Sequence, residues 1–481
     1  MQKLRLLIAC TVVLVATVVP LTASAVPPEV AEATATFEYS QNMHPIGYSA
    51  REIPIDNNVP GSGSFNSDLA FWGNMAVQGS YAGFRLINIS APAKPKEIIN
   101  YEECFSRFNS AGNQGDITIW GDILMRSWNS GADEGDTCDG EPVPEDTEGV
   151  HVFDISDPTD PDVVAYVPTP CGSHTQTLVP DLANDRLLIY SNPSSGAILG
   201  GDPGGEPPIS CRGIDIIEVP LADPSAAFYL RFEPAGDPAM PAEEHHPCHD
   251  TAVILGKTNL VACAGSGSAS AGTGINVFTV DPAEGGSKED PKWLYHKVTG
   301  GISLGHSASF TWDGEIIIVG HEPGGGSGAR CEATDDPLER TFFFVQAQTG
   351  ASLGQFTIPR PQTNVENCTT HNYNVVPLRK RYVMVSGNYQ SGISVIDFTD
   401  PANASEIAYA DPAPLVDPNP PVGIELGGDW STYWYNGEIY ESDITRGLII
   451  WKLSDKAVSG ARKLDHLNPQ TQMFNIRSRI G

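Results

Sequence analysis

The chain has 481 residues, of which 48 are glycine and 39 are proline, and 40 % of its residues are hydrophobic. So many glycines and prolines interrupt long helices, while the hydrophobic content is sufficient for a large core; the composition therefore excludes disorder and collagen and predicts a loop-rich all-β protein. The 59 acidic and 28 basic residues give a net charge of −31, which excludes a nucleic-acid-binding chain and disfavours docking on anionic membranes.

Residues 1–25 are typical of a secretory signal peptide. Lys3 and Arg5 provide positive charge ahead of an apolar run over residues 6–21, and small residues at 23–25 form a cleavage site. No later stretch of the sequence approaches the ~20 apolar residues that are needed to span a bilayer. We therefore expect a soluble, secreted protein, extracellular or in the periplasmic or cell-wall space, without membrane contact once the signal is removed.

Eight cysteines remain after removal of the predicted signal peptide, and an even number in an exported chain predicts disulfide bonds. The sequence alone leaves many pairings open. We predict sequential pairing, because each bond would then connect neighbouring strands or loops. The predicted bonds are Cys104–Cys138, Cys171–Cys211, Cys248–Cys263 and Cys331–Cys368.

A short pattern recurs along the chain: a glycine, three or four strand-forming residues, an acidic or amide residue, an apolar residue and often Ser/Thr-Asp-Pro. Its copies begin at Gly83, Gly149, Gly213, Gly274, Gly392 and Gly447, and the run 342–345 fills the gap between the fourth and fifth. Each copy belongs to a unit with two earlier strands and one later strand, separated by turn residues. Seven such units predict an all-β, seven-bladed β-propeller with four antiparallel strands per blade.

This parse divides the chain into a signal peptide (1–25), an N-terminal extension (26–61), the propeller (62–465) and a C-terminal tail (466–481). The copies that start at Gly149 (GVHVFDISDP) and Gly392 (GISVIDFTDP) resemble the repeat of the LVIVD family of secreted bacterial β-propellers. The resemblance implies the propeller fold and export. Because its motif marks one strand and the following turn, it implies no catalytic residues.

Four histidines occupy one position in the repeat. His174, His249, His306 and His371 each open the first strand of units three to six. In a propeller the first strand of a blade is the innermost, so equivalent residues form a ring at the channel mouth. Neutral imidazole nitrogens are ligands for copper, iron and zinc. We predict that these four histidines bind one transition-metal ion, copper, iron or zinc; the alternative is that they merely form hydrogen bonds across the channel.

Two aspartates, Asp68 and Asp116, hold the corresponding places in units one and two. They are predicted to orient or balance the metal site from outside the ligand shell. His249, His306 and Asp116 are the predicted catalytic residues.

Several other side chains lie near the predicted mouth. His245 and His246 are ligands, groups that support the ligands from outside, or residues of a solvated loop. His321 and Glu322 follow the second strand of unit five, where they either reach the funnel or cap a turn. Tyr373 is more typical of core packing.

The function that this pattern favours is that of a secreted, metal-dependent enzyme, an oxidoreductase rather than a hydrolase. A small-molecule or glycan substrate would bind at the channel mouth. Two alternatives stay open: a polysaccharide lyase or hydrolase that uses the same cluster, and a non-enzymatic binding or adhesion scaffold. Because protons compete with metal for imidazole nitrogens, we expect metal affinity to fall below about pH 6.

Overall fold

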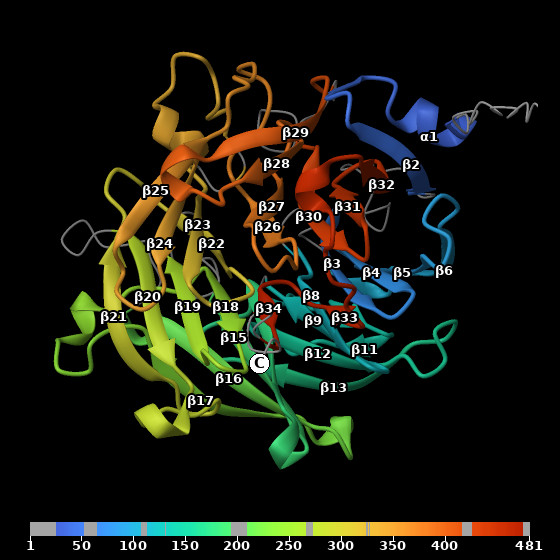
Figure 1. Ribbon diagram of the computed structural model, residues 1–481. Coiled ribbons are helices and arrows are strands. Elements are labelled where there is room, and N and C mark those ends of the chain that lie inside the picture. The colour runs from blue at the N-terminus through green and yellow to red at the C-terminus, as the bar shows by residue number, and fades with distance from the viewer. Residues whose placement is uncertain are drawn as a thin grey trace, which may run out of the picture.

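The computed structural model describes residues 26–51, 65–106, 113–129, 131–193, 209–265, 273–323, 326, 328–415 and 426–474. Within these residues, strands form seven four-stranded antiparallel units that follow one another around an axis (Figure 1). The all-β propeller fold is thereby confirmed. The predicted signal peptide, residues 1–25, lies outside the described residues.

The first four blades follow the chain order, from the innermost strand outwards. Blade 1 consists of β3 (Asn66–Trp72), β4 (Met75–Ser80), β5 (Gly83–Asn88) and β6 (Lys96–Tyr101). Blade 2 consists of β8 (Ile117–Trp120), β9 (Ile123–Trp128), β12 (Gly149–Asp154) and β13 (Asp162–Pro168). Blade 3 consists of β14 (Thr175–Asp181), β15 (Arg186–Asn192), β16 (Gly213–Pro220) and β17 (Phe228–Pro234). Blade 4 consists of β18 (Asp250–Ile254), β19 (Leu260–Gly265), β20 (Gly274–Thr279) and β21 (Lys292–Val298).

The last three blades complete the ring. Blade 5 consists of β22 (Gly305–Phe310), β23 (Ile316–His321), β24 (Thr341–Gln346) and β25 (Ser352–Thr357). Blade 6 consists of β26 (Asn372–Val375), β27 (Val383–Gly387), β28 (Ile393–Asp397) and β29 (Ser405–Pro412). Blade 7 consists of β30 (Asp429–Tyr435), β31 (Glu438–Asp443), β32 (Gly447–Leu453) and β2 (Met43–Ala50). One parallel pair, between Asn372 and Ser431, joins the inner strands of blades 6 and 7.

The remaining elements are short. A small sheet beside blades 1 and 2 contains β7 (Cys104–Phe105), β10 (Thr137–Cys138) and β11 (Glu141–Pro142). One α-helix, α1 (Pro28–Ala33), precedes β1 (Phe37–Tyr39). The 3₁₀ turns are η1 (Leu182–Asn184), η2 (Ile209–Cys211), η3 (Pro224–Ala226), η4 (Ala242–Glu244), η5 (Pro282–Glu284), η6 (Pro337–Arg340), η7 (Pro401–Asn403) and η8 (Lys456–Val458). No helix among the described residues is long and apolar enough to cross a membrane.

The repeat of the sequence has a physical basis at both ends of the third strand. A Cβ atom on Gly149 would lie 2.2 Å from the Val167 carbonyl oxygen, so the fourth strand approaches as closely as it does because no side chain intervenes. At the other end of that strand, Asp154 accepts a hydrogen bond from the Ser156 backbone N–H at 2.8 Å. Asn88 and Asp397 form the same Asx turn in blades 1 and 6, which explains the acidic or amide residue at this place in these three copies.

Both ends of the chain add strands to the propeller. The N-terminal β2 pairs with β32 and completes blade 7, and β1 pairs with the outer strand of blade 6. At the C-terminus, β33 (His466–Leu467) pairs with β3, and β34 (Thr471–Gln472) lies parallel to β18 near the centre of the ring (Figure 1). The segments set apart in the sequence as extension and tail therefore supply strands to blades 1, 4, 6 and 7.

The C-terminal residues 466–474, which we call the plug, lie where the inner strands end. The Asn468 amide donates to the Ile119 carbonyl in blade 2 at 2.8 Å. The Thr471 hydroxyl donates to the Leu178 carbonyl in blade 3 at 2.9 Å, and the Gln472 amide donates to the Phe310 carbonyl in blade 5 at 2.5 Å. The plug thus bonds to five adjacent blades. We call its side the plugged face and the opposite side, where the inner strands begin, the mouth face.

Four disulfides connect segments of the mouth face. The bonds are Cys104–Cys138, Cys171–Cys211, Cys248–Cys263 and Cys331–Cys368. The predicted sequential pairing is therefore confirmed. Some of the cysteines precede an inner strand. The others lie near the end of a second strand or after it. Inner strands begin, and second strands end, at this face. Disulfides of this number are typical of proteins that fold in an oxidising compartment.

Candidate metal centre

The four predicted histidines lie side by side at the mouth face. His174, His249 and His371 directly precede the inner strands of blades 3, 4 and 6, and His306 is the second residue of β22 in blade 5. Successive ring centroids are 4.6, 4.3 and 4.3 Å apart around the axis. The inner strands thus bring the four imidazoles into one continuous cluster.

Exposure differs along this cluster. The side chains of His306 and His371 are buried, with residue exposures of 3 and 2 %. His174 and His249 are half-buried. The solvent-exposed side of the cluster is therefore that of blades 3 and 4.

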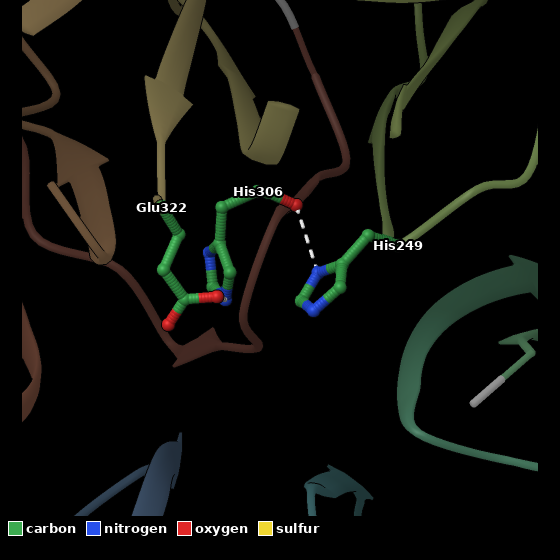
Figure 2. Close-up of side chains that lie close together, drawn as sticks. All are labelled: His249, His306 and Glu322. Carbon is green, nitrogen blue, oxygen red and sulfur yellow. Dashed lines mark hydrogen bonds and ion pairs between the residues drawn. The ribbon is translucent and has the colours of Figure 1, made fainter. Parts of the chain in front are cut away.

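Glu322 adds a carboxylate to the histidines (Figure 2). It follows β23, whose last residue, His321, pairs with Gly305 at the start of β22; this places Glu322 beside His306. Its Oε2 is 3.5 Å from His306 Nε2, and its Oε1 is 3.7 Å from His371 Nε2. One ligand atom from each of His249, His306 and Glu322 lies within 4.8 Å of the other two. The sequence left open whether Glu322 reaches the channel mouth or caps a turn. The structure places it at the channel mouth.

Hydrogen bonds determine which nitrogen carries the proton in two of the rings. His249 Nδ1 lies 3.1 Å from the His306 carbonyl oxygen, and His371 Nδ1 is bonded to the Trp430 carbonyl oxygen. A carbonyl only accepts, so in both rings Nδ1 carries the hydrogen and Nε2 presents its lone pair. This is the usual arrangement of a metal-ligating histidine, whose other nitrogen donates to a backbone carbonyl.

His174 has the opposite tautomer. The Asn129 Oδ1 accepts from the Gln114 backbone N–H at 2.6 Å, so its Nδ2 is the atom that faces His174 Nδ1 at 2.9 Å. The amide donates to Nδ1, which leaves the imidazole proton on Nε2. That proton is donated to His249 Nε2, 3.0 Å away. Of the four histidines, His174 is therefore the least suited to bind a metal directly.

Burial sets the charge of the cluster. It lowers the pKa of His174 to about 4 and that of His371 to about 3, and it lowers the pKa of His249 and His306 well below the usual value. Burial also raises the pKa of Glu322 to about 8, although the hydrogen bond from the Tyr389 hydroxyl at 2.7 Å opposes this. At neutral pH the imidazoles are neutral and Glu322 is protonated, so a bound cation would compensate for loss of that proton.

The aspartates of blades 1 and 2 lie one residue beyond the ring position, contrary to the predicted equivalence. The ring residue of one blade bonds to the carbonyl of the ring residue in the next, as His249 does to His306. The register of β3 with β4 matches that of β22 with β23, which aligns Ser67 with His306. Ser67 also donates to the Gly115 carbonyl at 3.1 Å. The ring positions of blades 1 and 2 are therefore Ser67 and Gly115. Both β3 and β22 have a β-bulge at this point, so Asp68 corresponds to Ser307 and not to His306.

Asp68 and Asp116 point to other partners inside the channel. Asp68 accepts from the Leu69 backbone at 2.7 Å and from the Tyr433 hydroxyl at 3.1 Å, and Asp116 accepts from the Gln176 backbone at 2.7 Å. Within the described part of the chain, neither carboxylate forms a hydrogen bond or ion pair with a ring histidine. The geometry thus offers no support for Asp116 as a catalytic residue.

The other candidates have structural partners. His246 stacks on His296 with centroids 3.9 Å apart, and His245 lies against Gly236. The backbone N–H of Ser303 donates to His321 Nε2 at 3.1 Å. The buried Tyr373 hydroxyl donates to the Ser307 carbonyl at 2.8 Å, which agrees with core packing.

No protein-family model matches this chain, and no curated protein matches it. The resemblance to the LVIVD family therefore stays a prediction. Solved structures that are similar include a protein from Lactobacillus plantarum (13 % identity, TM-score 0.47, covering 85 % of this chain and 97 % of that chain). Another is the Cps50 (Swd1) β-propeller domain of Myceliophteria thermophila (10 % identity, TM-score 0.46, covering 83 and 100 %). At such identities the likeness concerns the fold alone.

Proposed function

We propose that this protein is an exported enzyme that depends on a transition metal at the mouth of the propeller. The convergence of His249, His306, His371 and Glu322 from blades 4, 5 and 6 carries this proposal. Imidazole nitrogens select transition metals, whereas calcium and magnesium prefer sites made of oxygen ligands. The four disulfides at the same face support folding in an oxidising compartment.

The donor set favours a redox-active metal over zinc. Three imidazoles and one carboxylate would fill the four positions of a tetrahedral zinc ion and leave no place for substrate. Iron and copper take five or six ligands, so the same set leaves positions open, and two histidines with one carboxylate are the ligands of many non-haem iron oxygenases. We therefore propose iron or copper and an oxidoreductase activity on a small-molecule or glycan substrate.

The protein side of the chemistry follows from the exposure of the cluster. Substrate enters beside the half-buried His174 and His249. The Nε2–H of His174 then becomes a hydrogen-bond donor to a ligand, because a metal on His249 removes its present acceptor. Glu322 loses its proton when the metal binds, and the Tyr389 hydroxyl keeps that carboxylate in place.

Metal analysis of the exported protein tests this proposal. We expect the wild type, purified without added metal, to contain one iron or copper ion per chain. His249→Ala should lose the ion, whereas His44→Ala, a matched change at an exposed histidine of β2, should retain it. A wild type that contains no metal and takes up neither iron nor copper nor zinc would overturn the proposal and leave a scaffold function.

A further inference from the structure

The plugged face carries a group of positive charges in a chain whose net charge is −31. The group comes from the turn between β26 and β27 and from η8 with the segment after it. A hydrogen bond from the Arg462 backbone N–H to the Pro377 carbonyl at 2.9 Å joins the two regions. We call it the basic cluster. Its members are Arg379, Lys380, Arg381, Lys456, Arg462 and Lys463.

A cavity lies inside this cluster. Its volume is 420 Å³, and its lining contains Pro377, Arg379, Gly460 and Arg462. Two guanidinium groups thus border one concave site. The Arg462 guanidinium lies over the Phe474 ring at 4.5 Å, which holds it in place before any ligand arrives.

The acidic residues of the protein do not neutralise this cluster. Arg381 pairs with Asp397 at 2.6 Å, but the other five cations form no ion pair among the residues that the structure describes. Asp455, the nearest acid in sequence to Lys456, instead accepts from the Asn42 amide and from the Ala457 backbone. The cavity therefore has an uncompensated positive charge.

We propose that this cavity binds a phosphate group of linear polyphosphate, a flexible anionic chain of phosphate units. Arginine presents planar N–H donors that match phosphate oxygens in pairs, and Lys380 and Lys463 extend the positive charge for neighbouring units. A flexible chain meets only this local charge. A planar anionic membrane would also face the acidic surface around the cluster, beyond the screening length of about 8 Å, and would be repelled by it.

Binding there would leave the metal centre accessible, because the cavity and the histidines lie on opposite faces. The inference goes beyond the proposed enzymatic function and does not depend on it. It assigns the plugged face to attachment and the mouth face to chemistry.

Titration with linear polyphosphate at low salt tests the inference, with inorganic phosphate as the single-unit comparison. We expect saturable binding of polyphosphate, weaker binding of inorganic phosphate and an affinity that falls as salt rises. Arg379→Glu/Arg462→Glu should weaken polyphosphate binding by about tenfold or more. Arg379→Glu/Lys380→Glu, which spares the contact of Arg462 with Phe474, should act in the same direction.

Lys94→Glu/Lys96→Glu is the matched control, since it makes the same charge change at exposed lysines in blade 1. It should leave polyphosphate affinity within about twofold, because those lysines lie outside the cavity. Equal weakening by both pairs would overturn the inference and indicate non-specific attraction. So would failure of the wild type to bind polyphosphate, or binding to vesicles of phosphatidylcholine and phosphatidylglycerol that exceeds polyphosphate binding and is lost in the variants. Metal content measured on the same samples separates this result from the metal proposal.

Discussion

The two halves of the mouth face use the same backbone positions for different purposes. In blades 3 to 6 the ring residue is a histidine, whereas blades 7, 1 and 2 have Trp430, Ser67 and Gly115 there. An apolar cluster of aromatic and aliphatic side chains from blades 6, 7 and 1 packs on that side. Its members are Phe65, Tyr81, Tyr389, Trp430 and Ile444. The seven repeated blades therefore place the histidines on one side of the axis and aromatic side chains on the other.

The two halves also differ in their disulfide bonds. Cys171, Cys248 and Cys368 lie three, one and three residues before His174, His249 and His371. The aromatic half has no such bond directly before a ring residue within the described residues. The disulfides thus fix the segments that carry three of the four ring histidines.

The largest difference is expected between one histidine and one aromatic residue. His306→Ala should abolish metal retention, because it removes a buried ligand that contacts Glu322. Trp430→Leu should retain the metal, because that side chain packs against the ring of His371 and donates nothing to it. Metal content per folded chain is the measurement. An equal loss of metal from both variants would contradict the distinction between the two halves.

Removal of the bond before His249 should have the next largest effect. Cys248→Ser/Cys263→Ser opens a loop of 15 residues, which should cost about 3 kcal/mol of unfolding free energy, and it should weaken metal binding. Cys104→Ser/Cys138→Ser opens a longer loop of 34 residues but precedes no ring histidine. This second variant should lose at least as much unfolding free energy but keep its metal affinity. An equal loss of metal affinity in both variants would contradict the proposed role of Cys248–Cys263 in holding His249.

The pH dependence of metal binding should follow Glu322 rather than the histidines. Burial raises the pKa of Glu322 to about 8, and the metal binds its deprotonated form, so affinity should increase about tenfold per pH unit up to about pH 8. Burial keeps the pKa of His371 at about 3, so its protonation does not compete near pH 6. The fall in affinity that ordinary histidine pKa values predict below about pH 6 is therefore expected to begin already below about pH 8. Glu322→Gln should flatten the profile between pH 6 and 8, as titration with the metal would show.

The smallest effect concerns His174. Asn129→Asp keeps the acceptor for the Gln114 N–H but replaces the amide donor by an oxygen, which favours the proton on His174 Nδ1. The Nε2 lone pair would then face the metal, so affinity should increase severalfold. An unchanged affinity would show that His174 stays outside the ligand shell in either tautomer. A decreased affinity would contradict the assigned tautomer.

Much of this architecture is encoded in short patterns. The glycine and the Asx turn of each third strand made the blades predictable, and the four histidines share one register with them. Three features could not be predicted from the sequence. The local register of β3 leaves no trace in composition, and the ring position of blade 1 was assigned to Asp68, one residue beyond Ser67. The role of Glu322 depends on which end of β23 meets the mouth. The pairing of β2 with β32 joins segments at opposite ends of the sequence.

That last pairing sets the order of events when the protein is made. Ala50 lies opposite Gly447, so the partner of an early strand is synthesised only near the end of the chain. The plug, residues 466–474, comes later still, and it ties five blades together. Ring closure by such distant contacts is intrinsically slow. The ring of blades therefore cannot close until residues 447–474 have been synthesised, so the earlier blades must persist for most of synthesis without their last partner strands.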